Sequence, residues 1–108
     1  MKLTIRARHL DLAPELRDLI HRRLDFALGR LAGEIEAVDV TVADLNGPKG
    51  GPDKQCRVRI RCRALGTVVV EHVGSEILPV ASLAADRAER AVGRALARSR
   101  RFAPALTV

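Results

Sequence analysis

The sequence predicts one α+β domain in which a four-stranded mixed sheet carries two helices packed on one face. Apolar residues alternate with polar ones in four short segments, and they recur every three or four positions in two longer ones. The segments follow one another in the order β-α-β-β-β-α. A chain of 108 residues has the usual size of one domain, and no internal repeat divides it.

The first half predicts a strand, a helix and a second strand. Residues 2–8 alternate strictly, as a half-buried strand does. Pro14 suits the first turn of a helix, and apolar residues at helical spacing extend that helix to about Gly33. Those residues are Leu16, Ile20, Leu24, Ala27, Leu28 and Leu31. Residues 34–44 alternate again, and because a helix separates the two strands we expect them to be parallel.

The middle of the chain predicts two further strands joined by hairpins. Residues 54–64 and 67–73 alternate, and Gly66 between them marks a tight turn. Residues 46–52 are rich in glycine and proline, which predicts an exposed hairpin loop before the third strand. Hairpin connections make these strands antiparallel.

A second helix is predicted over residues 79–101. Its buried side should consist of Val80, Leu83, Ala84, Ala88, Ala91, Val92, Ala95 and Leu96. Both helices should cover one face of the sheet, because the other alternation is polar on several strands. Residues 1–101 then form the domain, and residues 102–108, interrupted by Pro104, are expected to be a flexible tail.

Composition favours a polyanionic partner. The chain has 19 basic and 13 acidic residues, a net charge of +6 and a pI near 10.6. Only 2% of residues are aromatic, so Phe26 and Phe102 are the only rings on which a nucleic-acid base could stack. No signal peptide or apolar run of membrane-spanning length is present, and a cytoplasmic location is expected.

The charge is distributed unevenly along the chain. Residues 1–30 contain seven basic and four acidic residues, residues 31–53 one and five, and residues 54–108 eleven and four. General enrichment in arginine does not produce this contrast. The positions of the basic residues are therefore more informative than their number.

The last predicted helix has a stripe of arginines along one side. They follow one another by three or four positions: Arg87, Arg90, Arg94, Arg98 and Arg101. Like charges at this spacing repel one another, and Asp86 and Glu89 offset only part of the repulsion. The stripe favours phosphate binding, with a solvated helix face as the alternative.

The third predicted strand carries a ladder of arginines on the sheet face away from the helices. Together with the first strand it gives a secondary basic face made of Lys2, Arg6, Arg57, Arg59, Arg61 and Arg63. Asp39 and Glu71 can pair with some of these residues, so cross-strand ion pairs on an ordinary charged surface are the alternative.

The sequence gives no indication of an enzyme. Cys56 and Cys62 lie six residues apart on one strand, which is too far to share a metal ion or to form a disulfide. The three histidines have neither ligand nor triad spacing, and there is no convincing pair of catalytic carboxylates. The glycines near residue 50 lack the spacing of a phosphate loop. We expect no catalytic residues, metal, cofactor or small-molecule substrate.

Three segments resemble a known family. Residues 8–17 are similar to the start of its first helix, residues 38–42 to its second strand, and residues 86–90, followed by Arg94 and Arg98, to the basic segment of its last helix. Over residues 2–100 the chain resembles a short member of the ribosome hibernation-promoting factor family, which includes ribosome-associated inhibitor A. Ala13 departs from the family pattern, because a capping Ser or Thr is usual there.

The resemblance implies a stress-response regulator of translation that docks on the small ribosomal subunit, where messenger and transfer RNA otherwise lie. Basic residues of both helices contact ribosomal RNA in that family. By position, the implied contacts are Arg23, Arg30, Arg87, Arg90, Arg94 and Arg98. A monomer is expected in the free state, with no membrane partner.

Two other functions remain open at this stage. A general module that binds double-stranded RNA has a similar layout of strands and helices, and it should bind free duplexes well. A regulatory protein that docks on an acidic protein surface should keep its partner after nuclease treatment.

Overall fold

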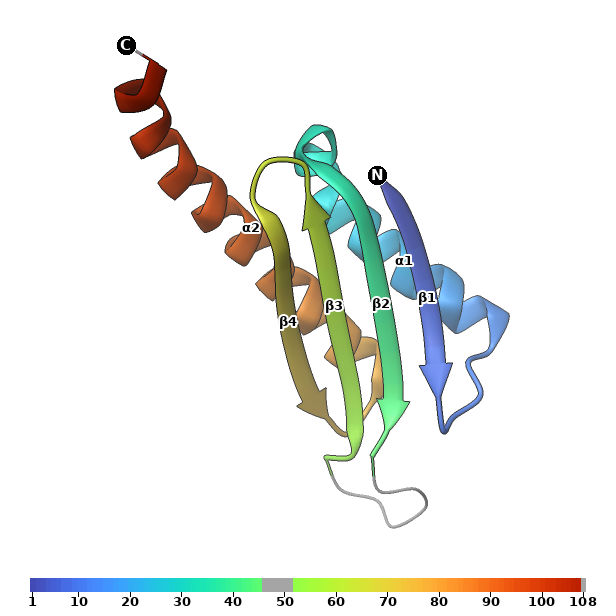
Figure 1. Cartoon of the computed structure of the whole chain (residues 1–108). Helices are drawn as coiled ribbons and strands as arrows, with labels where there is room; N and C mark the ends of the chain where they lie inside the picture. The colour runs from blue at the N-terminus through green and yellow to red at the C-terminus, as the bar shows by residue number, and fades with distance from the viewer. Residues whose placement is uncertain (46–51, 108) are drawn as a thin grey trace.

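The computed structural model describes the backbone of residues 1–45 and 52–107, and the side chains of residues 1–45 and 52–100. Its elements follow the predicted order (Figure 1). They are β1 Lys2–Arg8, α1 Pro14–Leu28, a 3-10 helix η1 Gly29–Glu34, β2 Ile35–Asp44, β3 Lys54–Cys62, β4 Gly66–Gly74 and α2 Ile77–Thr107. The predicted loop at 46–52, except for Pro52, and the Arg101 side chain lie outside the described residues.

The four strands form one sheet in the order β1-β2-β3-β4. β1 and β2 are parallel, whereas β2 pairs with β3, and β3 with β4, in antiparallel fashion. Both helices lie behind the sheet in Figure 1, and the far end of α2 projects beyond it. The predicted α+β fold, the order of its elements along the chain and the parallel and antiparallel pairings are thus confirmed.

The core lies between the sheet and the two helices. α1 and η1 bury Ile20, Leu24, Ala27, Leu28 and Leu31, as predicted. α2 buries Val80, Ala81, Ala84, Ala85, Ala88, Val92 and Leu96. The alanines have small side chains, which lets α2 approach both α1 and the sheet closely. Leu83 was predicted to be buried and is 47% exposed, because the buried side of α2 follows Ala81 and Ala85 instead.

The helix boundaries differ from the prediction at two places. α1 ends at Leu28 and the chain tightens into η1 from Gly29, where glycine weakens an α-helix. Leu31 stays in the core, so the apolar pattern alone did not show the change. α2 continues to Thr107, past the predicted end at 101. Leu96 is the last described core residue of α2. The apolar pattern that predicts a helix therefore fades after this residue and does not show where the helix ends.

A helix arginine binds each edge strand of the sheet. Arg17 of α1 donates a hydrogen bond from Nη1 to the carbonyl oxygen of Ile5 on β1, at 2.6 Å. Arg87 of α2 donates from Nη1 to the carbonyl oxygen of Glu71 on β4, at 3.1 Å. Both bonds connect the helix layer to the outer strands.

Gly74 ends β4 where no side chain fits. A Cβ atom at this position would lie 2.7 Å from Cγ2 of Val80, which is itself in the core. We expect Gly74→Ala to lower the free energy of unfolding by about 1–3 kcal/mol through overpacking, measured by urea denaturation. Gly33→Ala is the control, because nothing lies within 4 Å of the added atom. An equal loss in both variants would contradict the steric explanation.

Cys56 links stability to pH. Burial raises the pKa of its thiol from 9.0 to about 12. Between these values the unfolded chain loses the proton and the folded protein keeps it. The free energy of unfolding should therefore be unaffected by this thiol below pH 9 and should fall by about 1.4 kcal/mol per pH unit above it. Urea denaturation across this range should give a flatter pH dependence for Cys56→Ala than for the parent protein.

Candidate nucleic-acid interface

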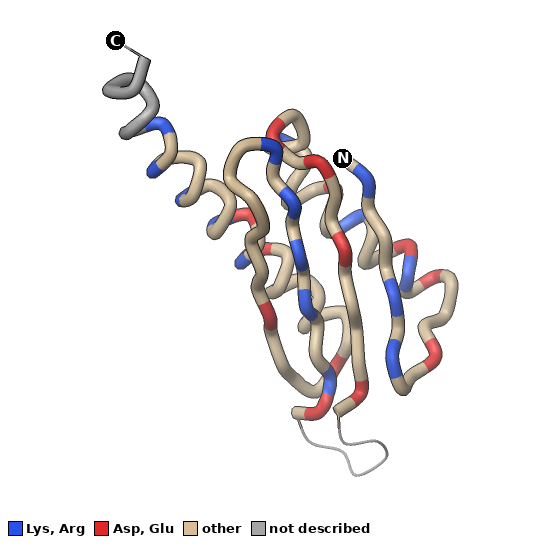
Figure 2. Tube along the Cα trace, in the orientation of Figure 1, with Lys and Arg blue, Asp and Glu red and all other residues tan. Residues whose placement is uncertain are grey.

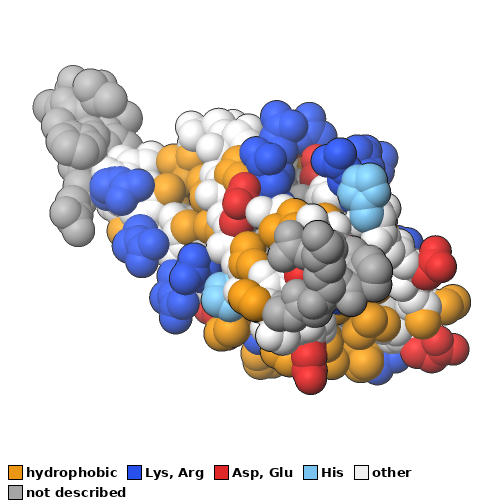
Figure 3. All heavy atoms as spheres, turned by 90° about the horizontal axis from the view of Figure 1, so that it is seen from below, with side chains coloured by type: hydrophobic (Ala, Val, Ile, Leu, Met, Phe, Trp, Pro, Cys, Tyr) orange, Lys and Arg blue, Asp and Glu red, His pale blue; other side chains and the backbone are white. Residues whose placement is uncertain are grey.

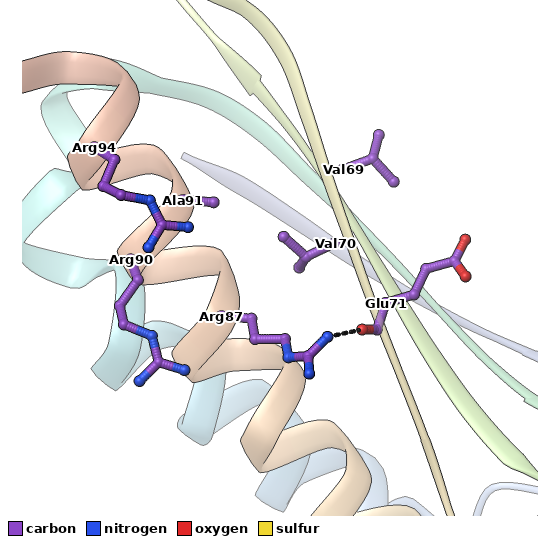
Figure 4. Close-up of a pocket in the computed structure, with 7 residues that line it drawn as sticks. All are labelled: Val69, Val70, Glu71, Arg87, Arg90, Ala91 and Arg94. Atoms are coloured by element: carbon purple, nitrogen blue, oxygen red, sulfur yellow. Dashed lines mark hydrogen bonds between the residues drawn. The ribbon is translucent and has the colours of Figure 1, made fainter. Parts of the chain in front are cut away.

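Three arginines of α2 line a groove beside the edge strand β4. The groove has a volume of about 470 Å³, and its walls are formed by Val69, Val70, Glu71, Arg87, Arg90, Ala91 and Arg94 (Figure 4). Arg87 is held by its bond to the Glu71 carbonyl. Within the described residues, the exposed side chains of Arg90 and Arg94 make no ion pair or hydrogen bond with the protein. We call this site the α2 groove.

The helical repeat explains the position of these arginines. Ala84, Ala88 and Val92 are fully buried on one side of α2, which turns the arginine stripe toward β4 and solvent. Arg98 is exposed one turn further along the helix and does not line the groove. The structure thus confirms that the four described arginines of the stripe are exposed.

The two predicted contacts on the first helical segment have protein partners. The Arg23 guanidinium lies 3.0 Å from Asp86 Oδ1 and donates from Nε to Ser82 Oγ at 3.3 Å. Arg30, in η1, pairs through Nε with Glu89 Oε2 at 3.1 Å. From the sequence, Asp86 and Glu89 were expected only to offset the repulsion among the arginines of the last helix. They also join the helices, and a phosphate must compete with them for Arg23 and Arg30.

The two pairs differ in exposure, which sets their strength. The side chains of Arg23 and Asp86 are 32% and 45% exposed, whereas those of Arg30 and Glu89 are 65% and 34% exposed, so Arg30 is the most solvated of the four. We expect a coupling energy of up to about 1 kcal/mol for Arg23 with Asp86, and less for Arg30 with Glu89. Double-mutant cycles with alanine, measured by urea denaturation, test this order. A larger coupling for the more exposed pair would contradict it.

The open face of the sheet carries five of the six residues predicted there. Lys2 and Arg6 of β1 and Arg57, Arg59 and Arg61 of β3 are all exposed. Among the predicted pairings, Arg57 lies 3.6 Å from Glu71. A hollow of about 350 Å³ is lined by Arg6, Asp39, Thr41, Arg57 and Arg59.

Arg63 does not continue the ladder. β3 ends at Cys62, and Arg63 begins the turn to β4. Its Nε donates to the carbonyl oxygen of Gly33 at 3.2 Å, and its backbone N–H donates to Glu34 at 3.0 Å. The alternating pattern predicted a fourth rung because it does not reveal where strand pairing stops.

The described residues offer little for other kinds of site. They contain no group of three or more potential metal ligands. Cys56 and Cys62 are free and buried. Among the described helices, none is long and apolar enough to cross a membrane. The part of the site that sequence reasoning missed is the wall formed by Val69, Val70 and Glu71, because only the fold places β4 beside α2.

Two solved structures share the fold. The crystal structure of the Thermus thermophilus Protein Y N-terminal domain aligns with a TM-score of 0.69 at 20% identity, over 87% of this chain and 98% of that one. A ribosomal subunit interface protein from Coxiella burnetii aligns with a TM-score of 0.73 at 16% identity, over 90% and 99%. A search of curated proteins gave no match.

The sequence itself matches a family defined by related sequences. The match covers residues 3–100 and thus includes β1 from its second residue, the other three strands, α1, η1 and most of α2. It is described as Sigma 54 modulation protein / S30EA ribosomal protein. The chain therefore belongs to the Sigma 54 modulation protein / S30EA ribosomal protein family.

Proposed function

We propose that this protein is a cytoplasmic ribosome-associated regulator of translation that binds the small ribosomal subunit and occupies the channel for messenger and transfer RNA. The α2 groove makes the main contact with ribosomal RNA through Arg87, Arg90 and Arg94. Arg98 extends that contact along the helix, and Arg23 of α1 and Arg30 of η1 contribute to it from beside α2. Such a protein acts by occupying a site and catalyses no reaction.

The observation that carries this proposal is the pair of unpartnered arginines in the α2 groove. Arg90 and Arg94 are exposed and make no bond to the described protein atoms, so no carboxylate is bound to them. Glu71 also lines the groove, but its carboxylate pairs with Arg57 of the sheet. An arginine guanidinium forms paired hydrogen bonds with phosphate. No described aromatic ring lines the groove, so binding depends on phosphate contacts and should weaken steeply with salt.

Family membership favours the ribosome over free RNA as the partner. A neighbour with the same fold is called a ribosomal subunit interface protein, and we extend that partner to this chain. A protein shaped for one site on the subunit should discriminate against duplexes that offer phosphates alone.

Cosedimentation tests the proposal directly. Purified protein is centrifuged with small subunits, with large subunits, or with small subunits plus an excess of double-stranded RNA. We expect it to pellet with small subunits and to remain bound in the presence of the duplex. Loss to the duplex indicates a general double-stranded-RNA-binding module. Binding to a partner that survives nuclease treatment indicates a protein ligand. Either result overturns the proposal.

A further inference from the structure

The open face of the sheet has two basic ridges, and Asp39 is the one charged residue among Ala37, Asp39, Thr41 and Ala43 of the strand between them. The strand register places Lys2, Ala37, Arg61 and Thr67 side by side in one row across the sheet. The next rows are Thr4, Asp39, Arg59 and Val69, then Arg6, Thr41, Arg57 and Glu71, then Arg8, Ala43, Gln55 and Val73. The basic residues therefore lie on β1 and β3, and β2 between them has none (Figure 2).

The side chains of β2 are short where they face the trough. Ala37, Asp39, Thr41 and Ala43 are all shorter than arginine, so the floor lies below the arginines on either side. Part of this floor is the hollow of about 350 Å³, which Asp39 lines together with the basic residues around it. Alternate strands of a sheet lie about 10 Å apart, which sets the distance between the ridges. We call this feature the β2 trough.

The charge of this face is strongly unbalanced. The four rows contain six basic residues against two acidic ones, Asp39 and Glu71. Glu71 is already engaged, because it lies 3.6 Å from Arg57 and accepts a hydrogen bond from Gln55 at 3.2 Å. Arg59 and Arg61 have no such partner among the described residues. Ion pairing within the sheet therefore leaves most of this positive charge uncompensated.

The trough is separate from the α2 groove. Viewed from below, basic side chains gather in two places, one over the open face of the sheet and one along α2 (Figure 3). The sheet lies between its open face and the core that it shares with the helices, so one ligand phosphate cannot touch both sites.

We propose that the β2 trough is a second RNA-binding site, which holds the phosphate backbone of a single-stranded segment between its two basic ridges. Neighbouring arginines of one ridge lie about 6.6 Å apart along the strand, a spacing comparable with that of successive phosphates in an extended RNA strand. The described face has no aromatic ring, so the bases point away and sequence is not discriminated. When the α2 groove is bound to the small subunit, the trough can hold a second RNA segment, so that the protein joins the two. This joining of two RNA segments rests on the proposed function.

Salt-dependent binding of a labelled single-stranded RNA tests the trough itself. Arg59→Gln with Arg61→Gln should weaken binding by about tenfold or more at low salt and should lower the slope of log affinity against log salt by about 1.4, for two lost phosphate contacts. Asp39→Asn should strengthen binding by up to about fivefold. A gain of affinity cannot result from unfolding. The Asp39→Asn variant therefore tests the trough even if the double glutamine variant loses binding because it misfolds.

A cross-linker locates the RNA. Thr41→Cys places a thiol in the hollow, and Cys56 and Cys62 are buried, so a thiol-reactive photo-cross-linker labels the introduced residue. RNA should cross-link from position 41 more efficiently than from Asp11→Cys, an exposed position in the connection before α1. Equal yields from both positions overturn the proposal.

The alternative occupant and the proposed function have distinct outcomes. An acidic protein segment is favoured if a polyglutamate peptide of equal charge displaces the RNA as well as unlabelled RNA does, and this result overturns the trough as an RNA site. If the trough variants leave RNA binding unchanged while Arg90→Gln with Arg94→Gln releases the protein from small subunits, only the proposed function stands. If the trough variants weaken RNA binding while Arg90→Gln with Arg94→Gln leaves binding to small subunits unchanged, the trough stands and the proposed function fails.

Discussion

Charge reversal at Arg90 and Arg94 together is expected to lower the affinity for the small ribosomal subunit by about 100-fold or more. Each guanidinium is exposed in the α2 groove without a described protein partner, so its contacts are free for phosphate. Replacing it with glutamate removes a charge-assisted hydrogen bond and adds repulsion. The dissociation constant, measured by cosedimentation at several salt concentrations, reports the loss.

Arg87 is best kept intact in this experiment. Its Nη1 donates to the Glu71 carbonyl, so its loss also alters the packing of α2 on β4. Lysine at positions 90 and 94 is the matched control, because it retains the charge and loses only the planar pairing with phosphate. We expect the lysine variant to bind within about tenfold of the parent protein. If the glutamate variant binds as tightly as the lysine variant, the α2 groove is not the main RNA contact.

Leu24→Ala is expected to have the largest effect on stability. Leu24 is fully buried on α1 and belongs to the hydrophobic core. Removing its methyl groups leaves a cavity in that core, at a cost of about 2–5 kcal/mol in the free energy of unfolding. Domains are commonly stable by about 5–15 kcal/mol in total, so the variant should unfold at a much lower urea concentration.

Leu19→Ala provides the comparison on the same helix. Leu19 is 42% exposed and lies outside the core, so the loss should stay below about 1 kcal/mol. The same residue change at two positions of one helix keeps helix propensity constant and varies only burial. Similar losses in both variants would contradict the assignment of the core.

Periodicity predicted the fold well because the chain has one sheet with one buried face. The buried residues of β2 and β3, such as Val40 and Val58, alternate as a half-buried strand requires. The resemblance over residues 2–100 is confirmed by the family match over 3–100. Leu83 was misplaced because the alanines on either side of it also recur at helical spacing. Periodicity alone therefore does not reveal which side of α2 faces the core.

The candidate site was predictable only in part. Helical spacing alone placed Arg87, Arg90 and Arg94 on one side of α2. The sequence could not show that Asp86 and Glu89 reach across to Arg23 and Arg30, because these contacts join residues about sixty positions apart. It also could not show that the ladder stops before Arg63, because the end of β3 depends on its pairing with neighbouring strands.

The arginines on the two edge strands also bear on how the protein behaves at high concentration. An edge strand offers backbone groups to which a strand of another molecule can bind, and such addition leads to aggregation. Arg17 occupies a carbonyl oxygen on β1 and Arg87 one on β4, and each brings a positive charge to its edge. A second copy that approaches either edge meets a cation and finds one acceptor already engaged. The same kind of side chain that can bind phosphate thus helps to keep the unbound protein from forming intermolecular sheets.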